Sequence, residues 1–247
     1  MNKYLIEVCA NSTESCIKAQ EGGAQRVELC AGIPEGGTTP SYGEISIARK
    51  RIDIALNVII RPRGGDFLYS EDEVEIMKRD IRMARELGSD GVVFGCLTRE
   101  GKVDKGLCKE LIFAAGHLSL TFHRAFDVCS DPFEALEDII ELGFDRILTS
   151  GCEANAIEGR DLLKELVEKA AGRIIIMPGC GVNENNIKEL QKHTGAVEFH
   201  MSARSKVNSE MVFRNDRVSM GGTVVVEEFS RDVTSAERVA DSLKELN

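Results

Sequence analysis

The sequence contains no tryptophan, and aromatic residues make up only 5% of its 247 residues. It also has fewer basic than acidic residues, 31 against 41, which gives a formal net charge of −10 at pH 7. Proteins that bind nucleic acid or an anionic membrane surface do so with a basic face, and single-stranded nucleic acid stacks on aromatic rings. We therefore expect neither nucleic acid nor a membrane among the partners of this chain.

Long apolar runs are also absent, since no stretch approaches the roughly 20 apolar residues of a membrane-spanning helix. The first residues, MNKYLIEVCANSTES, lack the apolar core and the small-residue cleavage site of a secretory leader. We therefore predict a cytoplasmic protein whose eight cysteines are reduced. No two of them form a C-x-x-C motif, which argues against a zinc ribbon or a thioredoxin-type redox pair.

Short runs rich in β-branched and aliphatic residues recur along the chain, with helix-like segments between them. The starts of consecutive runs lie between 21 residues (Tyr4 to Gln25) and 36 residues (Ala55 to Gly91) apart. This spacing is typical of βα units, which need about 30 residues each. The eight runs are YLIEVC (4–9), QRVELC (25–30), ALNVIIR (55–61), GVVFG (91–95), LSLTFH (118–123), DRILT (145–149), RIIIM (173–177) and AVEFHM (196–201).

Helix-start signals stand between these runs: Ser70 begins a capping box, and Asp131 precedes a proline at a first helical position. Eight strands, each followed by a helix, in about 250 residues predict an α/β fold, the (β/α)8 TIM barrel, with a doubly wound open sheet as the alternative. No linker divides the chain, so we predict a single domain over residues 1–247. The long loop after strand eight, residues 203–233, exceeds the usual connection and is expected to be a lid or an oligomer contact.

Ionisable side chains alternate with apolar ones near the carboxyl ends of the predicted strands. Apolar residues must face the helix layer and side chains two apart share a face, so the remaining residues point toward the barrel axis. A barrel interior is ordinarily filled by branched aliphatic side chains, and buried ionisable groups are costly unless they are paired or bind a ligand. The residues predicted to point inward are Glu7, Cys9, Glu28, Cys30, Arg61, Thr121, His123, Glu198, His200 and Ser202.

Two explanations fit these inward charges. One is an internal salt-bridge network that joins Arg61 to a glutamate, with Glu7, Glu28 and Glu198 as the candidates. The other is an active site at the barrel mouth, where enzymes of this fold place theirs. No lysine lies within a predicted strand, which excludes a Schiff-base aldolase. The catalytic candidates for acid–base chemistry are Glu7, Glu28, His123 and His200.

The turns after the seventh and eighth strands have the composition of an anion-binding site. PGCGVN (178–183) is a glycine-rich turn that leads into a helix, and on this fold these two loops are the usual phosphate site. We therefore predict that a small anionic metabolite, phosphorylated or carboxylated, binds here. The ligand-binding residues assigned to it are Arg61, Arg124, Asp127, Gly179, Gly181, Ser202 and Arg204.

Two cysteines occupy similar places in the first two strands, Cys9 in EVCA and Cys30 in ELCA. Adjacent strands lie about 4.8 Å apart, so two inward thiols can converge on one soft metal ion. Two thiolates suit Cu(I), and we predict Cys9 and Cys30 as its ligands. The alternative is that both are ordinary small buried residues.

Seven segments of the chain resemble the CutC family, whose members are named as copper homeostasis proteins. They are EVCANS, GGAQRVELCAG, IIRPRGGDF, TFHRAFD, ILTSG, PGCGVN and EFHMSAR. The resemblance implies a TIM barrel, a cytoplasmic location, a homo-oligomer, and Cu(I) bound by the thiols that match Cys9 and Cys30. It also implies a glycine where this chain has Cys180. Three functions therefore stand as hypotheses: binding of a copper ion, an enzyme acting on a small anionic metabolite, and a scaffolding barrel.

Overall fold

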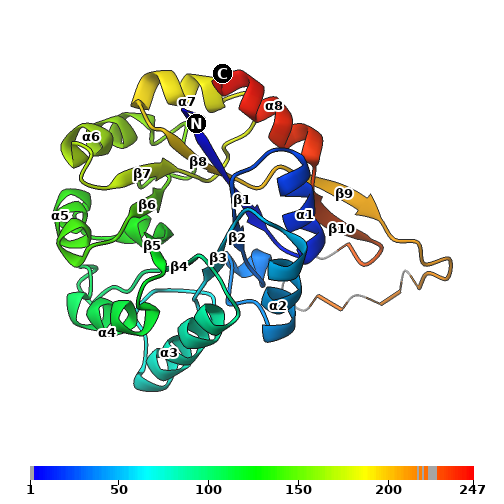
Figure 1. Ribbon diagram of the computed structural model, residues 1–247, viewed down its shortest axis with the longest axis horizontal. Coiled ribbons are helices and arrows are strands. Elements are labelled where there is room, and N and C mark those ends of the chain that lie inside the picture. Colours follow the sequence, from blue (N-terminus) through cyan, green and yellow to red (C-terminus); the bar gives the residue numbers. More distant parts are fainter. Residues whose placement is uncertain (1–2, 216, 219, 222–226) are drawn as a thin grey trace.

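The computed structural model describes residues 3–215, 217–218, 220–221 and 227–247. Its strands alternate with helices along the chain, and the helices form a ring outside the strands (Figure 1). The barrel strands are β1 (Leu5–Ala10), β2 (Arg26–Leu29), β3 (Ala55–Ile59), β4 (Gly91–Phe94), β5 (Ser119–Phe122), β6 (Arg146–Thr149), β7 (Ile175–Pro178) and β8 (Glu198–Met201).

The helices that cover the barrel follow their strands in order. They are α1 (Thr13–Glu21), α2 (Tyr42–Arg51), α3 (Glu71–Glu86), α4 (Lys105–Ala115), α5 (Pro132–Leu142), α6 (Arg160–Ala170), α7 (Ile187–Thr194) and α8 (Ala236–Leu246). Two 3-10 turns, η1 (Ile33–Glu35) and η2 (Arg124–Val128), follow β2 and β5. The two helix starts expected from the sequence are present: Ser70 and Glu73 form the capping box of α3, and Asp131 caps α5 with Pro132 at its first turn.

All eight barrel strands are parallel, in the order β7-β6-β5-β4-β3-β2-β1-β8. Strands β7 and β8, the two ends of this order, lie next to each other and leave the barrel nearly closed (Figure 1). The (β/α)8 TIM barrel predicted from the sequence is confirmed, and the open-sheet alternative is wrong. Apolar side chains on the outer strand faces, such as Ile6, Val27 and Phe199, are fully buried against the helices.

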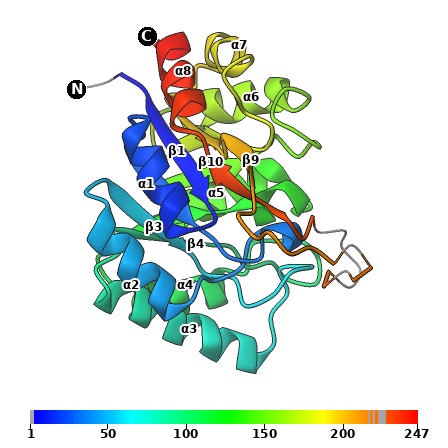
Figure 2. The ribbon, with the colours of Figure 1, turned by 90° about the vertical axis from the view of Figure 1, so that its right-hand side faces the viewer.

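The segment 203–233 contains structure that the sequence did not indicate. Strand β9 (Arg204–Asn208) pairs antiparallel with β10 (Ser230–Thr234), and this hairpin projects beside α1 (Figures 1 and 2). The backbone N–H of Thr234 donates to Oγ of Ser15 at 3.1 Å, which ties the base of the hairpin to α1. The apolar run 223–226 of this segment lies outside the described residues.

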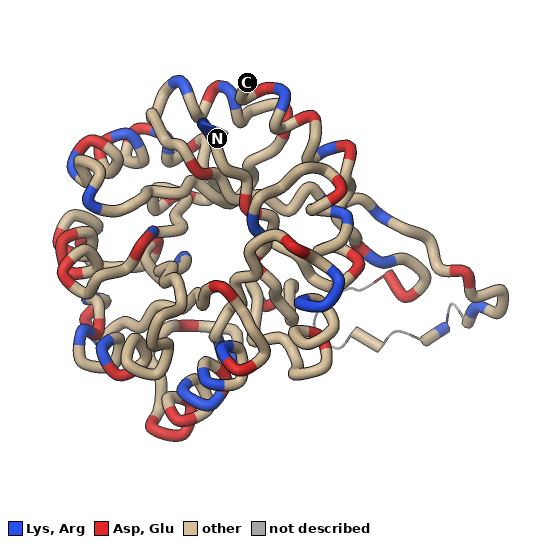
Figure 3. The backbone as a smooth tube through the Cα atoms, in the orientation of Figure 1, with Lys and Arg blue, Asp and Glu red and all other residues tan. Residues whose placement is uncertain are grey.

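Acidic and basic residues alternate around the outer ring of helices (Figure 3). Within the described part of the chain, none of the helices has the length and apolar character needed to cross a membrane. All eight cysteines are free thiols.

Candidate functional site

The stagger of the barrel decides which inward residues meet. In the β1–β2 ladder Glu7 lies beside Arg26 and Cys9 beside Glu28, so the two similar E-x-C segments are offset by two residues. In the β1–β8 ladder Glu7 lies beside His200. Because the strands of a barrel tilt against its axis, neighbouring strands are shifted in register. Cys30 therefore stands one inward position further toward the mouth than Cys9.

A layer of paired charges fills the barrel interior below the mouth. We call it the closed layer and define it by Glu7, Arg26, Arg146 and Glu198. Arg26 forms ion pairs with Glu7 and, at 2.5 Å, with Glu198, whose carboxylate also accepts from Nε of Arg146 at 3.3 Å. All four side chains are buried. The network expected from the sequence therefore exists, but the prediction that Arg61 forms it is wrong.

Arg61 is instead bonded to backbone carbonyls. Its guanidinium donates to the carbonyl oxygens of Glu35, Gly37 and Gly65 at 2.8–2.9 Å, which fixes the loops after β2 and β3. The arginines of the closed layer, Arg26 and Arg146, were missed in the sequence. The signal was present for Arg26, because it is two residues before Glu28 in β2 and so shares its face.

His200 links the closed layer to the mouth. Its Nδ1 lies 2.9 Å from Oε1 of Glu7, and its Nε2 lies 3.5 Å from Oε2 of Glu28. Burial acts to lower the pKa of His200, but its contacts with Cys9, Glu7 and Glu28 outweigh burial and hold the pKa well above its ordinary value. His200 is therefore a buried cation held between two carboxyl groups.

The two glutamates beside His200 have opposite pKa shifts. Burial acts to raise the pKa of Glu7, but Arg26 and His200 outweigh it and hold the pKa well below its usual range. Burial raises the pKa of Glu28 to about 8, and the attraction of His200 only partly offsets it. At neutral pH the site thus has one carboxylate and one carboxyl group poised to exchange a proton.

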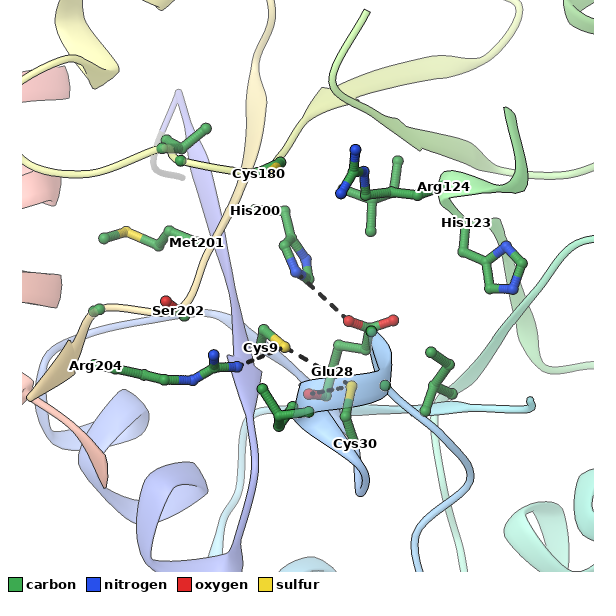
Figure 4. Close-up of a pocket in the computed structure, with 18 of the residues that line it drawn as sticks. Cys9, Glu28, Cys30, His123, Arg124, Cys180, His200, Met201, Ser202 and Arg204 are labelled. Carbon is green, nitrogen blue, oxygen red and sulfur yellow. Dashed lines mark hydrogen bonds and ion pairs between the residues drawn. The ribbon is translucent and has the colours of Figure 1, made fainter. Parts of the chain in front are cut away.

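The thiols of Cys9 and Cys30 lie together above these groups, with their Sγ atoms 3.8 Å apart (Figure 4). The pKa of Cys9 is held well below its ordinary value, first by the hydrogen bond with Cys30 and then by His200 and Arg204, against the effect of burial. The same hydrogen bond and burial raise the pKa of Cys30. Cys9 is the member of the pair that faces a cation, since Nη2 of Arg204 lies 3.5 Å from its sulfur, and this contact favours its thiolate form.

A cavity of about 520 Å³ opens above this group at the carboxyl ends of the strands, and we call it the mouth cavity (Figure 4). Of the residues predicted to bind or react, ten line it: Cys9, Glu28, Cys30, Arg61, His123, Arg124, Gly181, His200, Ser202 and Arg204. Sequence reasoning missed Phe67 and Arg238, which also line it, because both belong to segments remote from the strand ends.

Three predicted residues lie elsewhere. Glu7 lies in the closed layer beneath the cavity. Asp127 accepts hydrogen bonds from Thr149 and Ser150 and pairs with Arg124 at 2.7 Å, so it fastens the end of β6. The backbone N–H of Gly179 donates to the carbonyl of Thr149 at 2.9 Å and is therefore already used within the sheet.

Several buried polar atoms of the mouth cavity have no hydrogen-bond partner among the described residues. They are Oε1 of Glu28, Nε of Arg61, Nε2 of His123 and Nε of Arg204. A buried polar group without a partner is destabilising, and the great majority of such groups in native proteins are satisfied. The gathering of such atoms around one cavity indicates a binding site, in which a ligand would supply the missing hydrogen bonds.

Two residues of the cavity rim, Cys180 and Ala203, have left-handed backbone with φ of 70° and 46°. This conformation costs a residue other than glycine about 1–2 kcal/mol, and it recurs at functional sites. The glycine expected from the resemblance at position 180 would adopt it without strain.

Comparisons with known proteins agree with this structure. A model of the CutC family matches residues 4–205. The chain is 62% identical over 247 residues, its full length, to a Bacteroides fragilis protein named family protein CutC, of which it covers 98%. The chain belongs to the CutC family. It is also 50% identical over 238 residues to a Homo sapiens protein named copper homeostasis protein cutC homolog, covering 96% of this chain and 87% of that protein.

Solved structures show the same relationship. The structure of a CutC protein from Streptococcus agalactiae has a TM-score of 0.77 and 39% sequence identity, covering 81% of this chain and 98% of that chain. A thiamine phosphate pyrophosphorylase from Pyrococcus furiosus has a TM-score of 0.62, covers 99% of this chain and 96% of its own, and is 16% identical. The second likeness shows the fold alone, whereas the first places the chain among CutC proteins.

Proposed function

We propose that this CutC protein binds one Cu(I) ion through the thiols of Cys9 and Cys30. The observation that carries the proposal is the convergence of ligand atoms from Cys9, Glu28 and Cys30, which all lie within 4.8 Å of one another. Soft thiolate ligands select Cu(I) over harder ions. The proposal agrees with membership of a copper homeostasis family, and it requires the reduced thiols of a cytoplasmic protein.

The distances in the site fit one ion held by both sulfurs. Two metal–sulfur bonds of about 2.3 Å each span at most about 4.6 Å. The 3.8 Å between the two Sγ atoms therefore lets both thiols reach one ion without moving apart. A carboxylate oxygen of Glu28 lies within 4.8 Å of both sulfurs, and it offers a third, harder ligand atom.

The electrostatics of the site prepare one thiol for metal binding. A thiol binds a metal as the thiolate, so its proton must leave on binding. The hydrogen bond with Cys30, and then His200 and Arg204, lower the pKa of Cys9, which favours the thiolate form that a metal binds. Cys30 keeps its proton in the free protein, because its pKa is raised, and releases it when the ion binds.

The test is an anaerobic titration with Cu(I) against a competing chromophoric chelator. We expect one tightly bound Cu(I) per chain in the parent protein and loss of that binding in Cys9→Ser and in Cys30→Ser. The matched control is Cys129→Ser with Cys152→Ser, a second pair of neighbouring thiols that lies outside the mouth cavity. This control should bind copper as the parent does.

Two outcomes contradict the proposal. One is unchanged copper affinity in the doubly substituted Cys9→Ser, Cys30→Ser protein. The other is a preference for Zn²⁺ over Cu(I) in the same competition assay, which would make Glu28 and His200 part of a harder site.

A further inference from the structure

The mouth cavity is much larger than a metal ion requires. Its volume of about 520 Å³ falls in the range of pockets that hold small organic molecules, which is roughly 300–1,000 Å³. Apolar side chains form part of its wall, among them Ile59, Phe67 and Leu148. An ion at Cys9 and Cys30 would leave most of this space, and the unpartnered groups on its far side, without a ligand.

Arg61 is a buried cation in this wall without a carboxylate partner. The residue is 5% exposed, and no described carboxylate lies within ion-pair distance of it. Its two terminal nitrogens donate to backbone carbonyls, the Tyr69 hydroxyl lies close enough to interact with the guanidinium, and Nε has no hydrogen-bond partner among the described residues. A buried charge without a counter-ion is strongly unfavourable, so the site is electrostatically incomplete as it stands.

His123 offers a second donor near Arg61. Its Nδ1 accepts a hydrogen bond from the backbone N–H of Ala125 at 3.2 Å, so in a neutral ring the proton is on Nε2. Burial, together with the charge of Arg61, lowers the pKa of His123 to about 3, which keeps the ring neutral. Nε2–H is therefore a buried donor that has no acceptor.

Phe67 contacts both of these side chains. The Arg61 guanidinium carbon lies 5.0 Å from the centre of the Phe67 ring, and the His123 ring centre lies 4.9 Å from it. In the close-up His123 is on the opposite side of the cavity from Arg204, with Cys9 and Glu28 between them (Figure 4). A molecule bound at Arg61 and His123 thus extends toward the thiol pair.

We propose that the mouth cavity binds a small organic acid, whose carboxylate accepts hydrogen bonds from Nε of Arg61 and Nε2 of His123. The apolar part of the acid then lies against Phe67 and Leu148, and its other end reaches Glu28 and the thiols. The anchoring of the carboxylate is independent of the copper proposal, because Arg61 and His123 are not among the proposed copper ligands.

The charges favour a carboxylate over a phosphate dianion. Of the arginines that line the cavity, Arg124 is paired with Asp127, Arg238 is paired with Glu184, and Arg204 faces the sulfur of Cys9. Only Arg61 is left without an anionic partner among the described residues, so one negative charge balances the site.

The test compares benzoate with its neutral analogue benzamide, and both with inorganic phosphate, by calorimetric titration of the copper-free protein at constant ionic strength. We expect saturable binding of benzoate, with benzamide and phosphate at least about tenfold weaker, because a hydrogen bond to a charged group is worth a factor of that size. Benzamide binding equal to benzoate, phosphate binding tighter than benzoate, or no saturable benzoate binding would overturn the proposal.

Variants locate the binding. His123→Asn keeps an acceptor for the N–H of Ala125 but lacks the Nε2–H donor, and Arg61→Met lacks the cation. Each should weaken benzoate binding about tenfold or more. Arg63→Met is the matched control, since Arg63 also bonds several loop carbonyls but lies outside the cavity wall, and it should bind benzoate as the parent does. Parent-like binding in both His123→Asn and Arg61→Met would overturn the proposal.

The copper and benzoate assays test the two proposals separately, because different variants should abolish the binding of each ligand. The Cys9→Ser, Cys30→Ser protein should lose Cu(I) and still bind benzoate, whereas His123→Asn should lose benzoate and still bind Cu(I). If the Cys9→Ser, Cys30→Ser protein lost benzoate binding and His123→Asn kept it, the anion would bind at the thiols. That result would overturn the assignment to Arg61 and His123.

Discussion

The closed layer and the mouth cavity are neighbouring parts of one barrel interior, and both contain arginine and glutamate. In the closed layer every guanidinium meets a carboxylate, and Glu7 contacts Arg26, Asn57 and His200 at once. In the mouth cavity Glu28, Arg61, His123 and Arg204 each keep a buried polar atom that has no partner within the described part of the chain. The same residue types therefore support the fold in one place and leave binding capacity in the other, and the difference lies in which partners the strand register brings within reach.

The largest effect we expect is from removing the shared cation of the closed layer. Arg26→Met leaves Glu7 and Glu198 with fewer positive partners in a buried site, and breaking a buried ion pair costs about 3–5 kcal/mol. Urea unfolding of the copper-free protein measures this loss. Arg61→Met should cost less, because no carboxylate loses its counter-ion there. Equal losses in the two variants would remove the distinction between the two regions.

The next effect is that Glu28 and Glu7 contribute to the free energy of unfolding with opposite dependence on pH. The folded-state pKa of Glu28 is raised from 4.5 to about 8, so the folded protein binds the proton more tightly than the unfolded chain does. Through this group the free energy of unfolding falls by up to about 1.4 kcal/mol per pH unit between pH 5 and pH 8. Glu28→Gln should therefore become more stable relative to the parent as the pH rises across this range.

Glu7 should behave in the opposite way. Its pKa is lowered in the folded state, so its stabilising contribution is present above about pH 4.5 and is lost as the pH falls below it. The deficit of Glu7→Gln relative to the parent should shrink in acid. Unfolding curves of the copper-free parent and both variants, measured from pH 3 to pH 8, test the two signs together. Parallel curves for parent and Glu28→Gln would contradict the assignment of a raised pKa to Glu28.

A smaller effect concerns the reactivity of Cys9. The pH profile of its alkylation by iodoacetamide reports the thiolate fraction. Arg204→Met removes a cation 3.5 Å from the sulfur, so the midpoint of the profile should move to higher pH. Arg63→Met, outside the cavity, should leave the midpoint unchanged. Coincident profiles for the parent and Arg204→Met would show that Arg204 does not act on this thiol.

The smallest effect is expected at the rim, where Arg124 pairs with Asp127. The Arg124 side chain is 42% exposed, and Asp127 keeps its hydrogen bonds from Thr149 and Ser150 without it. Arg124→Met should therefore cost less than about 1 kcal/mol of unfolding free energy. If Arg124→Met lost as much unfolding free energy as Arg26→Met, this rim ion pair would support the fold as strongly as the ion pairs of the closed layer do.

The architecture was open to prediction because it depends on local patterns. Eight apolar runs at the spacing of βα units gave the barrel, and helix-start residues such as Ser70 and Asp131 are where they were expected. The inward face of each strand followed from alternation, and it identified Glu7, Glu28 and His200 as buried ionisable groups. The hairpin of β9 and β10 was not predicted, because its strands are exposed and carry little apolar signal.

The sequence could not predict which charged side chains pair with one another inside the barrel. Arg61 was expected to neutralise a buried glutamate, yet Arg26 and Arg146 do so, and Arg61 is held by loop carbonyls. Alternation tells which face a side chain is on but carries no information about its height along the barrel axis. That height depends on the shift between neighbouring strands, which all eight strands determine together.

The fold, the inward face of each strand and the presence of two thiols at neighbouring strand ends follow from the amino-acid sequence alone, because they rest on periodicities within single segments. Only the assembled barrel brings Cys9 beside Glu28, pairs Glu7 fully, and leaves Arg61 and His123 each with a buried nitrogen that has no hydrogen-bond partner among the described residues. Charge pairing in a buried site depends on distances between segments far apart in the chain, and only the closed barrel sets those distances.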